Sequence, residues 1–141
     1  VKRPPEKKPE EAKAIPEAAV LKSPEEVLIE RLKRGEKILI EGLVYEKDDF
    51  IPKGDLKPII TIGKFLKENP AISITIVGHA SSDEKMAMVS MLRALHIAKV
   101  LYKHFNLEQG RVKVKGAGSS EPVDPKNPVK NRRIEVFIST Q

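Results

Sequence analysis

Apolar residues recur at helical spacing in three segments of the chain, and each segment has recognisable end signals. The first, residues 24–34, follows Ser23-Pro24-Glu25-Glu26, which combines a capping serine, a proline suited to the first helical position and a capping-box glutamate. The second, residues 56–69, ends at Asn69-Pro70, where the proline prevents continuation. The third and longest, residues 83–105, is apolar on most sides. The pattern therefore predicts three helices.

Strand-like patterns lie between and after these helices. Residues 37–45 hold apolar positions around Gly42 and are typical of a bulged strand, and residues 46–55 form a polar turn region. Residues 71–77 alternate isoleucine with serine and threonine, the period of a strand. Short strands are also predicted around residues 112–114 and 134–138, separated by a proline-marked loop.

The element order predicts an α/β (α+β) fold. Strands separated by helices pair in parallel through right-handed crossovers, while the last strand can return antiparallel. We therefore expect a mixed sheet of β-α-β-α-β-β order with helices packed on it, preceded by a short N-terminal helix.

The 141 residues divide into two parts. Residues 1–22 carry four prolines among lysine, glutamate and alanine, and are too polar and proline-broken to pack. They are interpreted either as a tether that holds the domain away from another structure or as a disordered end. Residues 23–141, including the helix at 24–34, have the length of one domain.

Composition removes several classes of function. No run approaches the roughly 20 apolar residues of a membrane-spanning helix. Cysteine is absent, and the three histidines lack HExxH spacing or clustered acidic partners, so no metal or cofactor is expected. Neither a phosphate-binding loop nor a GxSxG elbow occurs, so no catalytic centre is expected and the chain is predicted not to be an enzyme.

The charge leaves the partner open. A formal charge of +6 favours anionic polymers without selecting one. The basic residues near the C-terminus alternate along strands as a solvated face would, and the chain has only six aromatic residues and no tryptophan. Nucleic acid is therefore not expected as a partner.

Two loop regions are candidate binding sites in such a fold. One is the turn at Gly78-His79 with Arg93 further along the next helix, and the other ends at Asn131-Arg132-Arg133. Met86, Ser90 and Arg93 are spaced i, i+4, i+7, so on one helix they share a face and Arg93 points back toward the turn. An arginine there can hold a carboxylate in a bidentate pair, which indicates an anionic ligand.

Six short motifs occur in the order expected of a known family. They are Leu32-Lys33-Arg34-Gly35-Glu36-Lys37-Ile38, Leu66-Lys67-Glu68-Asn69-Pro70, Ile74-Thr75-Ile76-Val77-Gly78-His79, Ser90-Met91-Leu92-Arg93-Ala94, Gly116-Ala117-Gly118-Ser119-Ser120-Glu121-Pro122 and Asn131-Arg132-Arg133-Ile134-Glu135-Val136. Over about residues 28–139 the sequence resembles the OmpA-like C-terminal domain family, the peptidoglycan-associated modules of outer-membrane proteins, lipoproteins and flagellar stators.

This resemblance implies a ligand. Family members bind the stem peptide of the cell wall through diaminopimelate, whose ammonium meets an Asp and whose carboxylate meets the Arg of an N-x-x-L-S-x-x-R-A motif. Arg93 and Ser90 match that motif, and Asn131 and Arg132 match the family's NRR. The resemblance therefore implies that these residues contact the ligand, near the turn that holds His79.

The sequence also departs from the family pattern. The family's G-H-T-D reads Gly78-His79-Ala80-Ser81, so Ser81 stands where the ammonium-binding Asp is expected. Met86 replaces the motif Asn, and the turn before Arg93 is about three residues shorter than usual. Asp83 either takes over the ammonium role or caps the following helix.

Two functions follow from the resemblance. The first is a periplasmic module, associated with the outer membrane or another envelope complex, that tethers an envelope protein or complex to peptidoglycan through diaminopimelate. The second is a domain that has lost diaminopimelate binding and serves protein–protein contacts in an envelope, secretion or motility assembly. The apolar segment 86–101 would be either a partner-facing surface or part of the domain's own core, and a homodimer is left open.

Overall fold

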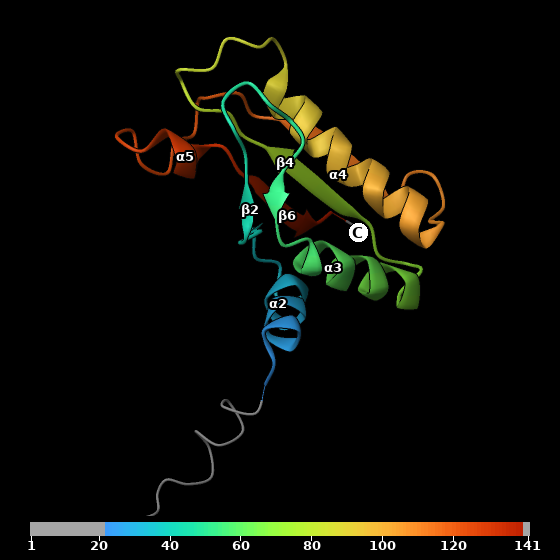
Figure 1. The fold of residues 1–141 in the computed structure, drawn as a ribbon. Coiled ribbons are helices and arrows are strands. Elements are labelled where there is room, and N and C mark those ends of the chain that lie inside the picture. Colours follow the sequence, from blue (N-terminus) through green and yellow to red (C-terminus); the bar gives the residue numbers. More distant parts are fainter. Residues whose placement is uncertain (1–21, 140–141) are drawn as a thin grey trace, which may run out of the picture.

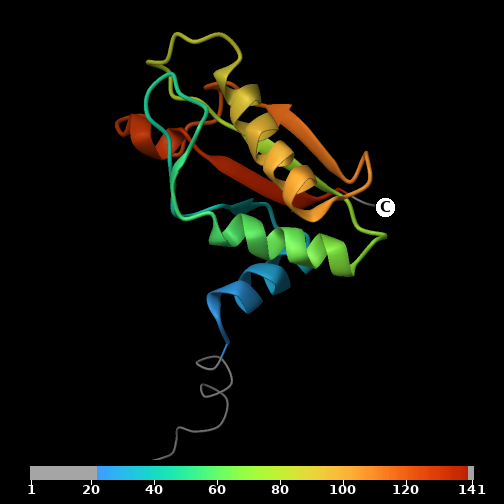
Figure 2. The same ribbon diagram turned by 45° about the vertical axis from the view of Figure 1, so that its right-hand side comes forward.

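A four-stranded mixed sheet carries the fold, and the long helix α4 runs along one face of it with α3 beside α4 (Figures 1 and 2). The computed structural model describes residues 22–139, so residues 1–21 of the predicted tether lie outside the described residues. The helices are α2 (Pro24–Lys33), α3 (Lys57–Glu68), α4 (Val89–Phe105) and the short α5 (Pro128–Asn131). The strands are β1 (Ile38–Leu39), β2 (Leu43–Val44), β3 (Lys53–Gly54), β4 (Ile74–Gly78), β5 (Val112–Gly116) and β6 (Ile134–Ile138).

The sheet order is β1-β6-β4-β5. β4 pairs in parallel with β5, and β6 is antiparallel to both β4 and β1. The mixed sheet and the antiparallel return of the last strand confirm the prediction. β6 lies between β1 and β4, so β1 pairs with β6 and not with β4.

The core lies between the sheet and the helices. Ile62 and Leu66 of α3 and Ile97 and Leu101 of α4 are almost completely buried, as is Ile76 on the sheet. Burying side chains of this size stabilises the folded state by about 1.5 to 3 kcal/mol each. The apolar segment predicted as either a partner surface or core is therefore core where it belongs to α4.

Helix α2 begins as the sequence predicts. The Ser23 hydroxyl accepts a bond from the Glu26 amide at 3.1 Å, and the Glu26 carboxylate accepts from the Ser23 amide at 2.9 Å. This reciprocal capping box satisfies two amides that the helix itself leaves free. The buried Leu32 then docks α2 onto the core.

The predicted bulged strand at residues 37–45 is two separate strands. Gly42, with φ of 91°, turns the chain between β1 and β2, and its carbonyl accepts from the Asp55 amide at 3.0 Å. β2 then pairs with β3, which lies in the segment predicted to be a polar turn. The short α5 likewise forms inside the predicted proline-marked loop.

The helix predicted for residues 83–105 begins only at Val89. The amides of Lys85 and Met86 both donate to the Asp48 carboxylate, each at 2.7 Å, and Met88 has a φ of 60°. Because these groups are held by a distant side chain and a left-handed residue interrupts the helix, the predicted first turn is not helical. Met86 therefore does not share a helix face with Ser90 and Arg93, and Asp83 is not a helix cap.

Gly78 sets the distance between β4 and α4. A Cβ atom at this position would collide with the backbone carbonyl of Ser90. Gly63 on α3 also faces a near neighbour, but that neighbour is the ring of Phe105, a partly exposed side chain at the end of α4. A backbone cannot yield as readily as the end of a side chain.

We expect Gly78→Ala to lower the free energy of unfolding by about 1 to 3 kcal/mol, because α4 must move away from the sheet. Gly63→Ala is the comparison, since Phe105 can rotate and alanine favours the helix by about 1 kcal/mol. Urea unfolding of both variants measures the difference. Equal stability of the two variants would contradict the close approach described above.

Arg111 holds the end of α3 to β5. It is buried, and its guanidinium donates to the carbonyls of Leu66, Asn69 and Ile72, the last at 2.8 Å. These carbonyls lie at and just after the end of α3, where the helix leaves acceptors unpaired. A guanidinium is suited to this position because it supplies several donors in one plane.

We expect Arg111→Ala to destabilise the domain by about 2 to 3 kcal/mol, because three carbonyls lose the bond from this buried guanidinium. Lys113→Ala, at an exposed position two residues away on β5, should change the unfolding free energy by less than about 0.5 kcal/mol. Thermal and urea unfolding would measure both. A cost for Arg111→Ala no larger than that for Lys113→Ala would show that the carbonyls do not depend on Arg111.

Candidate functional site

Arg93 lies completely buried on α4, and its guanidinium is fully hydrogen-bonded within the protein. Nε donates to the carbonyl of Asp49 at 2.9 Å, and the two terminal nitrogens donate to the carbonyls of His79 and Glu46 at 3.1 and 3.2 Å. Both terminal nitrogens also bind the Glu84 carboxylate. An arginine has five N–H donors, so these bonds use all of them.

Glu84 is the carboxylate partner of Arg93. Its side chain is 1% exposed, and its two oxygens take one terminal nitrogen of Arg93 each, Oε1 at 2.7 Å. Oε1 also accepts from the Ser81 amide at 2.9 Å, and Oε2 from the Asp48 amide at 2.7 Å. Burial by itself would raise the pKa of Glu84, but the bonds from Arg93 and the two amides hold that pKa below its usual value.

Three segments of the chain meet at this ion pair. The loop at residues 45–50 contributes the carbonyls of Glu46 and Asp49, and the ring of Tyr45 lies 4.9 Å from the Arg93 guanidinium. In the same loop, the Asp48 carboxylate accepts bonds from the turn that carries Glu84. The bond from the Met86 amide is the chief reason that the pKa of Asp48 is lowered. Arg93 and Glu84 therefore join this loop, the turn after β4 and α4.

Ser81, Asp83 and Arg132 form a second cluster beside the pair. The Ser81 hydroxyl donates to the Asp83 carboxylate and accepts from Arg132 at 3.1 Å. Arg132 also lies 3.8 Å from Asp83 and donates to the carbonyl of Tyr45 at 2.8 Å. The bond from Ser81 is the chief reason that the pKa of Asp83 is lowered. The Asp83 side chain is 43% exposed, so its carboxylate is accessible to solvent.

The other predicted site residues support the surrounding loops. The Ser90 hydroxyl accepts from the Gly118 amide at 3.0 Å. Asn131 is buried, and its side chain binds backbone groups of Val123 and Asp124.

His79 contacts Arg93 through its backbone, while its ring faces elsewhere. The buried ring lies 2.8 Å from Glu135, and Nδ1 has no hydrogen-bond partner among the described residues. Burial, followed by the nearby positive charge of Arg133, lowers the pKa of His79.

A pocket of about 190 Å³ lies next to the Arg93–Glu84 pair. It is lined by Ala80, Ser81, Ser82, Glu84, Met86, Met88, Val89, Ser90, Gly118 and Ser119. Glu84 belongs to this lining and Arg93 does not, and the Glu84 side chain, 1% exposed, is directed away from solvent and bonds Arg93. The structure therefore brings Ser81 and Ser90 to one pocket, with Asp83 and Arg132 beside Ser81, and leaves Asn131 and the ring of His79 outside the lining.

Glu84 was not predicted from the sequence. The only signal is an acidic residue within a turn that is shorter than the family pattern. Charged residues make up 33% of the chain, so one glutamate in a polar turn does not stand out.

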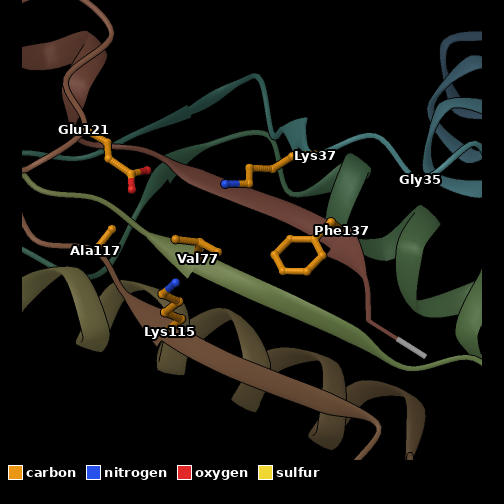
Figure 3. A pocket seen from close by; sticks show the side chains of 7 residues that line it. All are labelled: Gly35, Lys37, Val77, Lys115, Ala117, Glu121 and Phe137. Carbon is orange, nitrogen blue, oxygen red and sulfur yellow. The ribbon is translucent and has the colours of Figure 1, made fainter. Parts of the chain in front are cut away.

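A second pocket, of about 230 Å³, lies on the face of the sheet turned away from α4 (Figure 3). Lys37, Lys115 and Glu121 surround a floor that includes Val77 and Phe137. Lys37 lies 5.9 Å from the centre of the Phe137 ring, and neither lysine forms an ion pair with another described residue. The basic residues near the C-terminus therefore do not form one surface patch. Arg111, Arg132 and Arg133 are buried, whereas Lys115 lines this pocket.

Within residues 22–139, no group of three or more potential ligands could hold a metal ion. No described helix is long and apolar enough to cross a membrane.

The chain was compared with known proteins. The family model described as the OmpA family matches residues 53–135. Outer membrane porin F of Pseudomonas aeruginosa is 31% identical over 90 residues, which cover 59% of this chain and 26% of that protein. The chain therefore spans about a quarter of the length of this relative.

Solved structures show the same fold at lower identity. The C-terminal domain of Helicobacter pylori MotB has a TM-score of 0.61 at 21% identity, covering 72% of this chain and 87% of that one. The peptidoglycan-associated lipoprotein of Burkholderia pseudomallei has a TM-score of 0.61 at 16% identity, covering 69% and 88%. The cell wall anchor of the type VI secretion system (T6SS) of Pseudomonas aeruginosa has a TM-score of 0.57 at 16% identity, covering 81% and 94%. The family model matches more than half of the chain, so the protein belongs to the OmpA family.

Proposed function

We propose that the domain binds peptidoglycan non-covalently in the periplasm and anchors an envelope protein or complex to the cell wall. The observation that carries this proposal is the family match over residues 53–135. That range includes the pocket beside Ser81, and also Arg93 and Arg132. Two proteins of the same fold are named as a peptidoglycan-associated lipoprotein and a cell wall anchor. Attachment to the outer membrane or to another envelope complex is part of the same proposal.

The proposed ligand is the diaminopimelate of the stem peptide, a zwitterionic side chain with a carboxylate and an ammonium. The pocket beside Ser81 and Ser90 receives it, and Asp83 supplies the negative charge for the ammonium. Arg132 supports Asp83 through their shared contact with Ser81. Arg93 is the cation for the ligand carboxylate, while Asn131 and His79 shape the loops around the pocket.

One observation favours a second function. Every donor of Arg93 is used inside the protein, so a permanent Arg93–Glu84 pair would make Arg93 unavailable to a ligand carboxylate. In that case the domain would keep the fold and serve protein contacts. Met88, 68% exposed, and the neighbouring Met86 would then offer apolar contact area at the pocket rim.

We expect the wild-type protein to sediment with purified sacculi whose stem peptides contain diaminopimelate, and Asp83→Asn to bind about tenfold to a hundredfold more weakly. The reason is the loss of one charge-assisted contact with the ligand ammonium. The Asp83 side chain contacts Ser81 and Arg132 and does not bond Arg93 or Glu84, so its substitution leaves the buried pair intact. The bound fraction is measured over a series of sacculus concentrations, and excess free diaminopimelate should reduce it.

Asp55→Asn is the matched control, because it removes the same charge at an exposed position near the start of α3. It should bind like the wild type. If the wild type does not sediment, the anchoring function is wrong and the protein-contact function is favoured. Equal binding by wild type and Asp83→Asn would remove Asp83 from the site while keeping the function.

A further inference from the structure

Glu84 presents a carboxylate to Arg93, which is the same group that a carboxylate ligand would present. Its two oxygens take one terminal nitrogen of the guanidinium each, which is the bidentate geometry that arginine offers to any carboxylate. We propose that Glu84 is an internal competitor for the ligand carboxylate, and that a stem peptide reaches Arg93 only when Glu84 leaves it. This inference rests on the proposed function and specifies how that site is controlled.

The turn that carries Glu84 is attached mainly through this one side chain. Residues 82–88 form no helix or strand, and every one of them except Glu84 is exposed. The other ties include the Ser81–Asp83 contact, the bonds from the Lys85 and Met86 amides to Asp48, and the backbone bonds from Glu84 to Ser81 and from Val89 to Met86. Release of Glu84 therefore exposes no apolar core, and the left-handed Met88 separates the turn from the regular part of α4.

Arg93 would stay in place when Glu84 leaves. The carbonyls of Glu46, Asp49 and His79 still accept three of its N–H groups, and the Tyr45 ring still faces the guanidinium. The two donors set free are the pair that a carboxylate binds. Exchange therefore replaces one carboxylate by another and leaves no buried charge without a partner.

The pocket supplies the route to this exchange. Glu84 lies in its lining, with Ser81 and Ser90 on the same pocket and Arg93 behind Glu84. A ligand that fills the pocket lies against the turn that carries Glu84, and the Glu84 carboxylate, 1% exposed, must turn outward before the ligand reaches Arg93. The cationic part of such a ligand would face Asp83, so a zwitterion fits better than a simple anion.

Competition of this kind lowers apparent affinity by the fraction of molecules in the open state. If about 1 to 10% of molecules have Glu84 released, the ligand binds roughly ten to a hundred times more weakly than it would to an open site. Removing the Glu84 charge should recover much of that factor. A residue that only stabilises the fold would not increase affinity when it is replaced.

The test is a calorimetric titration of a stem tripeptide ending in diaminopimelate into the wild type and Glu84→Gln. We expect the variant to bind about tenfold tighter or more, and the peptide to raise its melting temperature further than that of the wild type. Glu121→Gln removes the same charge at an exposed position in the pocket on the opposite face, and it should bind like the wild type.

A second variant covers the case in which Glu84→Gln does not fold. Asp48→Asn leaves Glu84 and Arg93 unchanged but weakens the carboxylate clamp on the amides of Lys85 and Met86. Asn also tolerates the φ of 59° at this position. Because the turn opens more often, this variant should bind the tripeptide several-fold tighter than the wild type.

The outcomes separate the two proposals. Equal or weaker binding by Glu84→Gln and Asp48→Asn, with measurable binding by the wild type, would overturn the competitor role and keep the anchoring function. Absence of binding by the wild type and by both folded variants would overturn the anchoring function, and the competitor role with it. Tighter binding by the variants than by Glu121→Gln would support both.

Discussion

The buried ion pair between Arg93 and Glu84 determines how the loops at one end of the sheet are arranged. Removing one partner from such a pair typically costs about 3 to 5 kcal/mol, because the other charge remains buried and unpaired. The pair is tolerated here because the guanidinium uses all five donors and the carboxylate accepts four hydrogen bonds. The bonds join three segments, the loop at residues 45–50, the turn after β4 and α4, so two charges hold these segments in position.

Buried arginines have a general role in this domain. Arg93, Arg111, Arg132 and Arg133 are all nearly inaccessible to solvent, and each donates to backbone carbonyls outside regular strands. Irregular segments leave such carbonyls without partners, and a guanidinium can satisfy several of them at once. Part of the net charge of +6 therefore stabilises loops and does not form a basic surface. This explains why overall charge says little about the ligand of this protein.

The sequence predicted what depends on local pattern and missed what depends on distant contacts. The capping box of α2 and the alternation in β4 are encoded by near neighbours, and both were predicted. The start of α4 was misplaced because Asp48, almost forty residues away, binds the amides of the turn. The resemblance located Arg93 and the loops around it, but Glu84 could not be found, since only the fold shows which acidic residue of the turn points inward.

The buried guanidinium of Arg93 and the carboxylate of Glu84 satisfy one physical constraint. A guanidinium buried behind the pocket needs a carboxylate nearby, whether that carboxylate belongs to a ligand or to the protein. In the turn after β4, Glu84 reaches Arg93, and Ser81 supports Glu84 through its backbone amide. Under the proposed function, the stability of the empty domain and its affinity for a carboxylate ligand depend on the same two donors, so a sequence change that strengthens the first weakens the second.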